Sequence, residues 1–179
     1  MESMKIDKKF SLIGKLTQQE AFAMFDQLES VDLEFMYGKW KGTGLKTNHP
    51  MDGLLEITNW YGKEFIDSET VNPLIFQKKN GQLFVVNPGL VPLNLRIERL
   101  PSIIIKAGFK VAAMFIKTKT SKARLRMVEY RGKVSATMIY DQRPINDSFR
   151  KIDDNTVLGV MDLKGEERGY FFKLERVRI

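Results

Sequence analysis

Apolar and polar residues alternate with a period of two through the last third of the chain. In the segment 133–141, for example, Val134, Ala136, Met138 and Tyr140 fall on one side of an extended backbone. Breaks at Gly, Asn, Asp and Pro divide this part into predicted strands at residues 123–132, 133–141, 145–153, 156–163 and 169–177. Because short connections join neighbouring antiparallel strands, the pattern predicts an antiparallel meander whose apolar sets face a core.

The segment 17–29 has the helical period instead. Thr17 and Glu20, three positions apart, form a capping box at its start. An apolar stripe follows at helical spacing, formed by Ala21, Phe22, Phe25 and Leu28. We therefore expect an amphipathic helix with this stripe on the core.

The pattern is more broken between these two regions. It predicts a strand at 35–43, a loop at 45–53, a short strand or turn at 53–58, a helical turn at 60–67, a hairpin of 73–77 with 83–86, and an alternating segment at 93–98. Asn80-Gly81 indicates a type I′ turn in that hairpin. Residues 99–117 combine β-branched residues with lysines at helical spacing, and we interpret them as a helix or a pair of helical turns.

These elements predict a mainly β protein with a single domain over 1–179. Antiparallel strands in such number, about 8–10, lose their exposed edges by closing into a barrel. We expect a calycin-like barrel over 35–179, an N-terminal helical segment over 1–34 packed on it, and a lid helix within 99–117. A barrel of about eight strands can hold one small ligand.

The stretch YGKWKGTG, residues 37–44, is rich in glycine for a strand. Its residues Gly38, Trp40, Gly42 and Gly44 share one face. If that face points inward, Trp40 fills the base of the barrel, and the glycines make room around its ring and let the strand coil. A chance cluster of glycines in a loop is the alternative interpretation.

A glycine, a tryptophan and a late arginine carry a resemblance to known families. G-x-W on the first strand after a helix resembles the lipocalin and calycin barrels, in which an arginine, here Arg176, packs over the tryptophan. GKWKGTG is also similar to the first strand of the haem-binding nitrobindins. Together with WYGKEF, NPLIF, the segment 123–162 and YFFKLER, it resembles the GXWXG family of bacterial proteins with a C-terminal domain of unknown function. This resemblance runs from Phe35 to Arg176 and implies a fold but no activity.

Charge is concentrated in one segment. The chain carries +7, and the 28 residues from Lys106 to Lys133 hold nine basic residues and one acidic residue, which leaves −1 for the remainder. A solvated face, an anionic small ligand and an anionic membrane surface are the open interpretations. Nucleic acid is not favoured, because only Tyr130 interleaves the arginines as a stacking residue.

Few residues are available for metal or cofactor chemistry. The chain has no cysteine and one histidine, His49, which lies in a loop where we expect it to be solvated. Nitrobindin-like proteins bind haem through a histidine near the C-terminus, and this chain has none there, so we expect no histidine-ligated haem, no other cofactor and no metal. Tyr140 or Tyr170 could in principle ligate haem iron, although nothing specifically indicates it. The N-terminal sequence lacks the pattern of a secretory signal, and a cytoplasmic location is the expectation.

Two aspartates could carry chemistry. Asp141 and Asp147 flank a connection, and only Asp147 shares the phase of Phe149 and so points inward. A buried carboxylate needs a partner, and Arg124, Arg126 and Arg150 are the candidates. The alternative is that both aspartates only shape the turn.

The sequence thus predicts a binding protein for a small apolar or amphipathic ligand with an anionic group. The alternative is an enzyme that performs proton transfer or hydrolysis with Asp147 or Asp141. The expected ligand-binding residues are Trp60, Tyr61, Phe109, Met114, Phe115, Arg124, Arg126, Tyr130, Met138, Tyr140, Asp147 and Phe172. Residues expected to close the barrel are Gly38, Trp40, Gly42 and Arg176. The lid is expected to place Ile103, Ile104, Phe109, Met114 and Phe115 over the cavity, with Lys106, Lys110, Lys117 and Lys119 around its entrance.

Overall fold

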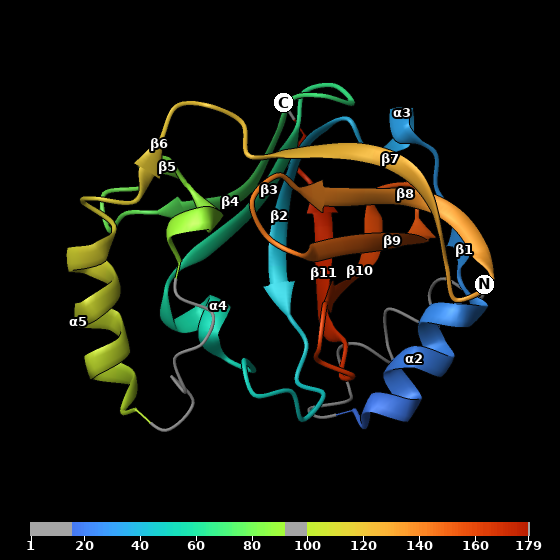
Figure 1. Ribbon diagram of the computed structural model, residues 1–179, viewed down its shortest axis with the longest axis horizontal. Coiled ribbons are helices and arrows are strands. Elements are labelled where there is room, and N and C mark those ends of the chain that lie inside the picture. Colours follow the sequence, from blue (N-terminus) through green and yellow to red (C-terminus); the bar gives the residue numbers. More distant parts are fainter. Residues whose placement is uncertain (1–15, 92–99, 179) are drawn as a thin grey trace.

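Eight antiparallel strands form a closed ring in the computed structural model, which describes residues 16–91 and 100–178 (Figure 1). In order around the ring they are β3 (Trp60–Phe65), β2 (Gly38–Gly44), β11 (Tyr170–Arg176), β10 (Thr156–Leu163), β9 (Ile145–Asp153), β8 (Lys133–Tyr140), β7 (Ala123–Tyr130) and β4 (Val71–Gln77). Pairing of β4 with β3 completes the ring. The pairing of β4 with β7 has a single paired position, Val71 opposite Ala123, which is the fewest between any two neighbouring strands of the ring.

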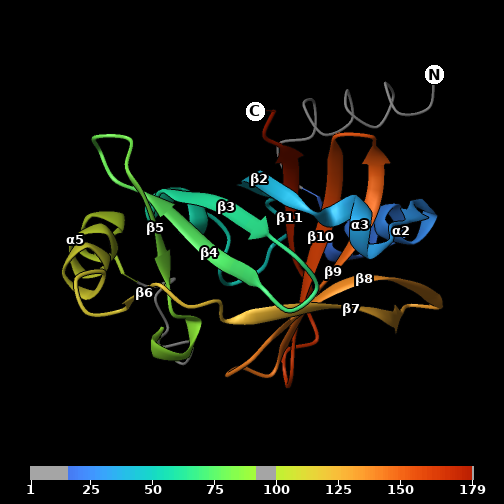
Figure 2. The same cartoon turned by 90° about the horizontal axis from the view of Figure 1, so that it is seen from above.

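The remaining elements lie outside the ring. They are α2 (Gln18–Gln27), β1 (Glu29–Ser30), α3 (Leu33–Met36), α4 (Leu54–Ile57), β5 (Leu83–Val86), η1 (Pro88–Leu90), α5 (Ser102–Ala112) and β6 (Lys117–Thr118). Strands β5 and β6 extend the sheet beyond β4, and β1 pairs with β9. Helices α2 and α5 lie at opposite ends of the molecule in both views (Figures 1 and 2).

The predicted C-terminal meander is confirmed, since β7 to β11 pair in sequence order along antiparallel registers. Alternate residues of β9, β10 and β11 face the ring interior or α2, so these strands are buried on both sides. Phe172 packs inside, whereas Phe171 packs outside against Phe25 of α2, with ring centroids 6.4 Å apart. Val134 does not face the core as predicted. It is 52% exposed near the start of β8, beyond the reach of the interior.

The N-terminal helix is confirmed together with its cap. The Thr17 side chain accepts from the Glu20 backbone N–H, and the Glu20 carboxylate accepts from the Thr17 N–H at 2.9 Å. Ala21 and Phe25 are buried against the outer face of the sheet. The capping box starts the helix, and burial of its stripe fixes it on the sheet.

Two predictions for the first half of the chain are wrong. Residues 54–57 form helix α4, and residues 60–65 form strand β3 rather than a helical turn. The aromatic residues of β3 favour a strand, and a bulge at Gly62 hides the alternation that would have indicated it.

The other predictions for this region concern the β4–β5 hairpin and the lid helix. The β4–β5 hairpin is confirmed, but its turn is not type I′: only Gly81 has a positive φ, of 84°, and Asn80 does not. The predicted alternating segment 93–98 lies outside the described residues. The helix predicted within 99–117 is present as α5.

Trp40 closes one end of the ring interior. It is fully buried, its Nε1 donates to the Met36 carbonyl at 2.7 Å, and the Arg176 guanidinium lies 4.2 Å from its ring centroid. Arg176 also donates to the Tyr37 and Phe35 carbonyls and so connects β11 to the chain before β2. The arginine thus covers the ring with its charged face and satisfies backbone carbonyls with its nitrogens.

The glycines of this strand have a different role from the expected one. A Cβ on Gly42 would lie 2.0 Å from the ring of Trp60, not of Trp40. The close approach to Trp40 belongs to Gly62, whose Cβ would lie 2.0 Å from the Trp40 carbonyl oxygen. The prediction that these glycines make room around the Trp40 ring is therefore wrong. Gly42 instead leaves the space in which the Trp60 ring lies.

Candidate functional site

A cavity of about 420 Å³ opens between one end of the ring and the helical layer of α4, η1 and α5. Its wall is almost entirely apolar. From the ring, the residues that matter most to its chemistry are Trp60, Lys63, Phe76, Tyr140, Asp147 and Phe172. From α5, it is lined by Ile104, Ile105, Gly108, Phe109 and Ala112. The volume lies in the range of pockets that hold small organic ligands.

A bulge in β3 brings Lys63 into this interior. The register of β3 against β4 shifts on both sides of Gly62, and Gly62 has a φ of 149°, which a side chain would strain. Because the bulge reverses the alternation, Trp60 and Lys63 point to the same inner face although they are three positions apart. The Lys63 Nζ donates to the Pro73 carbonyl at 3.1 Å.

Lys63 and Asp147 form a buried ion pair. The Lys63 Nζ lies 2.8 Å from Asp147 Oδ2, and the two side chains are 2% and 1% exposed. The ammonium is also within 5.0 Å of the ring centroid of Phe172 and 5.6 Å of that of Trp60. The charge is therefore held by one carboxylate, one carbonyl, the Tyr140 hydroxyl at 3.4 Å and aromatic faces, almost without exposure to solvent.

Asp147 has capacity for one more hydrogen bond. Its Oδ2 accepts from Lys63 and, at 3.4 Å, from the Tyr140 hydroxyl, but its buried Oδ1 has no partner among the described residues. Burial raises the pKa of Asp147, and the Lys63 ammonium offsets part of that rise. Burial and the neighbouring carboxylate raise the pKa of Tyr140 well above its ordinary value, so Tyr140 is a protonated donor. The cluster offers a vacant acceptor in an apolar space.

Arg143 supplies the second cation of the wall. From the β8–β9 connection its guanidinium donates to the carbonyls of Pro88, Gly89 and Val91, at 3.0, 2.7 and 2.6 Å. It lines the cavity beside η1 and forms no ion pair with a carboxylate of the described residues. Among the described residues only peptide carbonyls stabilise its charge, which no carboxylate neutralises, whereas the charge of Lys63 is matched by Asp147.

The structure brings five of the expected ligand-binding residues together. Around one cavity lie Trp60, Phe109, Tyr140, Asp147 and Phe172. Met138 is fully buried in the adjoining core but does not line the cavity. Asp141, the other aspartate considered for catalysis, is exposed.

The other expected residues lie elsewhere, each for a local reason. Tyr61 is opposite in phase to Trp60 and lies outside the cavity lining. Met114 and Phe115 follow the end of α5 and are 64% and 76% exposed, and Ile103 is 75% exposed on the outer side of that helix. The expected lid face is therefore wrong for these three residues.

The strand β7 also turns its expected site residues away from the cavity. Arg124 is exposed, and Arg126 forms an ion pair with Glu69. Tyr130 packs edge-on against Phe25 of α2, with centroids 6.2 Å apart. None of the three arginines proposed as partners of the buried aspartate reaches it. Arg150, the third, donates to the backbone carbonyls of Phe149, Tyr130 and Lys133 and lies over the ring of Phe25 in α2.

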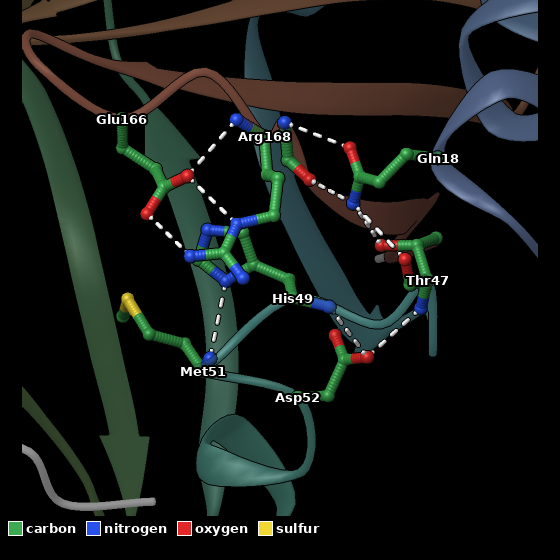
Figure 3. A network of polar contacts seen from close by, with 8 residues as sticks. Gln18, Thr47, His49, Met51, Asp52, Glu166 and Arg168 are labelled. Atoms are coloured by element: carbon green, nitrogen blue, oxygen red, sulfur yellow. Dashed lines mark hydrogen bonds and ion pairs between the residues drawn. The ribbon is translucent and has the colours of Figure 1, made fainter.

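His49 is buried rather than solvated, which corrects the expectation for this loop (Figure 3). It is 6% exposed, its ring centroid lies 5.0 Å from that of Tyr170, and its Nδ1 accepts from the Met51 N–H at 3.1 Å. Asp52 Oδ2 accepts from the backbone N–H groups of Thr47 and His49 and so fixes the loop. Burial lowers the pKa of His49 below its ordinary value, so the ring is neutral.

The network in Figure 3 continues from this loop to helix α2. Gln18 Nε2 donates to Thr47 and to the Gly169 carbonyl, and the Gly169 N–H donates back to Gln18 Oε1 at 3.0 Å. Glu166 accepts twice from the Arg168 guanidinium, and the charges of both residues act on the His49 ring. The network supports the wall behind Tyr170 and reaches the cavity lining only through Met51, so we assign it a structural role.

Metal and membrane-spanning features can be assessed for the same residues. Within 16–91 and 100–178, no three His, Asp or Glu side chains are grouped so that they could hold a metal ion. In that part of the chain no helix is long and apolar enough to cross a bilayer.

Fold and site together define an antiparallel β protein with an apolar interior cavity and a buried lysine–aspartate pair. Two protein-family models match parts of this chain. Residues 23–81 match the model of the GXWXG protein family, and residues 121–176 match a domain of unknown function (DUF4334). The chain belongs to the GXWXG family. A protein from Thermomonospora curvata with a crystal structure is 31% identical, with a TM-score of 0.73 over 99% of this chain and 100% of that one. None of the curated proteins compared is significantly similar.

Proposed function

We propose that this protein binds a small, largely apolar molecule inside a calycin-like barrel, with a polar group of the ligand at Asp147. The observation that carries this proposal is the buried Asp147 Oδ1, which has no partner among the described residues and lies in a largely apolar cavity. A buried acceptor without a partner costs free energy, and a hydroxyl or amide N–H of a ligand would remove that cost. The apolar wall would supply most of the affinity, at about 25 cal/mol per Å² of buried ligand surface.

An anionic group on the ligand would be placed at Arg143 rather than at Lys63. The charge of Lys63 is already matched by Asp147 at 2.8 Å, and the negative charge of Asp147 would repel a ligand carboxylate at this point. Within the part of the chain that the structure describes, Arg143 donates only to carbonyls, so it is available to an anion on the η1 side of the cavity. The proposed ligand is therefore amphipathic, with its apolar body between Trp60 and α5.

The test combines extraction with two probes. The purified protein is examined by native mass spectrometry for a co-purified small molecule. It is then titrated with the anionic dye 1-anilinonaphthalene-8-sulfonate and the neutral dye Nile red. Ala112→Trp fills the cavity from α5 and is expected to abolish binding of both dyes, whereas Ala107→Trp, on the exposed side of the same helix, is expected to leave it unchanged.

A second comparison tests the anionic group. Arg143→Gln is expected to weaken binding of the anionic dye and not of Nile red. The proposal of a ligand cavity fails if the parent carries no small molecule and binds neither dye, or if Ala112→Trp binds both dyes as well as Ala107→Trp does. Equal effects of Arg143→Gln on both dyes would remove the anionic group from the proposal.

Catalysis by Asp147 is the second candidate, and the same vacant oxygen favours it. A carboxylate whose pKa is raised by burial is suited to accept a proton, and the Lys63 ammonium and Tyr140 hydroxyl could stabilise negative charge that develops nearby. In this scheme Asp147 takes a proton from a ligand carbon or from water and later returns it. Incubation of the extracted molecule in deuterated water tests this candidate, since parent protein would introduce deuterium or convert the molecule and Asp147→Asn would not.

A further inference from the structure

Helix α5 and the residues just after its end carry exposed apolar side chains that do not line the cavity. Ile103, Val111, Met114 and Phe115 are 75%, 57%, 64% and 76% exposed. We call these four residues the outer face of α5. The opposite side of the helix lines the cavity. A helix that is apolar on both sides is normally covered on both, and an exposed apolar patch of this kind marks an interaction surface.

Four lysines lie in α5 and in the segment that follows it. Lys106, Lys110, Lys117 and Lys119 are all exposed, and residues 100–122 contain no Asp or Glu. Within the described residues none of these four lysines forms an ion pair. Apolar residues flanked by unpaired cations are the composition of helices that lie in the interface of an anionic bilayer.

We propose that the outer face of α5 docks on an anionic lipid bilayer, with the helix parallel to the membrane. The charges distinguish this occupant from a second copy of the chain, because a symmetric contact would bring the lysines of two copies together. The helix is also at one extremity of the molecule, so a flat surface can reach it (Figures 1 and 2). Docking would place the cavity one helix thickness from the lipid. The proposal goes beyond ligand binding and does not depend on it.

Vesicle flotation tests the proposal with the full chain. Vesicles of phosphatidylcholine alone are compared with vesicles that also contain phosphatidylglycerol, at low and high salt. Parent protein is expected to float only with the anionic vesicles and to dissociate at high salt, because screening shortens the reach of the lysines. Met114→Ser/Phe115→Ser is expected to abolish flotation. Ile66→Ser, at an apolar residue 55% exposed outside α5, is its matched control.

Charge reversal is the second arm. Each lysine near an anionic surface contributes about a fivefold factor in affinity, so Lys106→Glu/Lys110→Glu should weaken binding by more than about 25-fold. Lys41→Glu/Lys164→Glu makes the same change in net charge at exposed positions elsewhere and should bind nearly as the parent does. Circular dichroism verifies that each variant is folded.

Three results would overturn the proposal. They are absence of flotation with anionic vesicles at low salt, equal flotation with neutral vesicles, and flotation of Met114→Ser/Phe115→Ser at the parental level. Analytical ultracentrifugation adds a fourth: a dimer that this double variant dissociates would assign the outer face to self-association instead.

Discussion

Replacement of Lys63 by methionine is the most informative perturbation of the site. Methionine keeps a flexible stem of similar length and removes the ammonium, so Asp147 is left buried without its partner at 2.8 Å. Because both side chains are almost completely buried, solvent cannot screen the remaining charge. Removal of one partner of a buried ion pair costs about 3–5 kcal/mol, and we expect a loss of this size in the free energy of unfolding.

The double variant Lys63→Met/Asp147→Leu separates the pair from the site. Replacement of both partners by apolar residues of similar volume is commonly neutral, or stabilises by about 1–4 kcal/mol. The double variant is therefore expected to be close to the parent in stability and far more stable than Lys63→Met. Tyr140 and the Pro73 carbonyl each lose a hydrogen-bond partner, which offsets part of the gain at about 1 kcal/mol each.

The pH dependence has a definite sign. A buried carboxylate whose folded-state pKa is raised binds its proton more readily in the folded state, so stability falls as pH rises through that pKa. In Lys63→Met the offset from the ammonium is gone and the pKa of Asp147 rises further. The loss in free energy of unfolding of Lys63→Met relative to the parent should thus be largest at neutral pH and smaller in acid. The double variant should not show this dependence.

Urea unfolding followed by tryptophan fluorescence measures these free energies, since Trp40 and Trp60 are buried in the folded protein. The exposed pair of Arg131 with Asp26 supplies the control, and Arg131→Gln should cost about 1 kcal/mol or less. A loss of that small size for Lys63→Met, or a double variant no more stable than Lys63→Met, would refute the buried pair as described.

Three further predictions use the same unfolding assay. Gly42→Ala should destabilise by about 1–3 kcal/mol and shift the emission of Trp60, because its Cβ would lie 2.0 Å from that ring; unchanged stability and emission would show that the ring has room to move. Trp40→Ala should cost about 3–5 kcal/mol, and a smaller loss would contradict its role at the closed end. His49 has a folded-state pKa below its ordinary value of 6.5, so the free energy of unfolding should fall as pH falls below 6.5. His49→Gln should reduce this loss of stability in acid. An unchanged loss would show that other groups cause it.

The regular part of the fold was predictable because local pattern and tertiary environment agree there. In β7 to β11 the period of two coincides with the division between the ring interior and α2, and turn residues mark each break. Strand β3 was not predictable in the same way. Its bulge at Gly62 changes the phase within six residues, so WYGKEF shows neither period clearly, and the pairing with β2 and β4 decides its conformation.

A site residue was predictable only where the alternation along its strand alone determines whether its side chain faces inward. Asp147 follows the phase of Phe149 and does face inward. Lys63 was missed, because a lysine next to a glycine normally indicates a solvated position and the bulge cannot be read from one sequence. For α5, apolar residues occur on every side, so the pattern predicts the helix but not which side faces the cavity.

The hairpin of β2 and β3 connects the two ends of the ring interior. Gly62 lies against the Trp40 carbonyl at the end that Arg176 covers, and the same residue makes the bulge that turns Lys63 inward. Gly42, two residues after Trp40, leaves the space that the Trp60 ring occupies beside the cavity. The glycines around the tryptophan thus act on the site through the neighbouring strand, because each permits a close approach that a side chain would prevent. The first-strand motif therefore bears on the cavity as well as on ring closure.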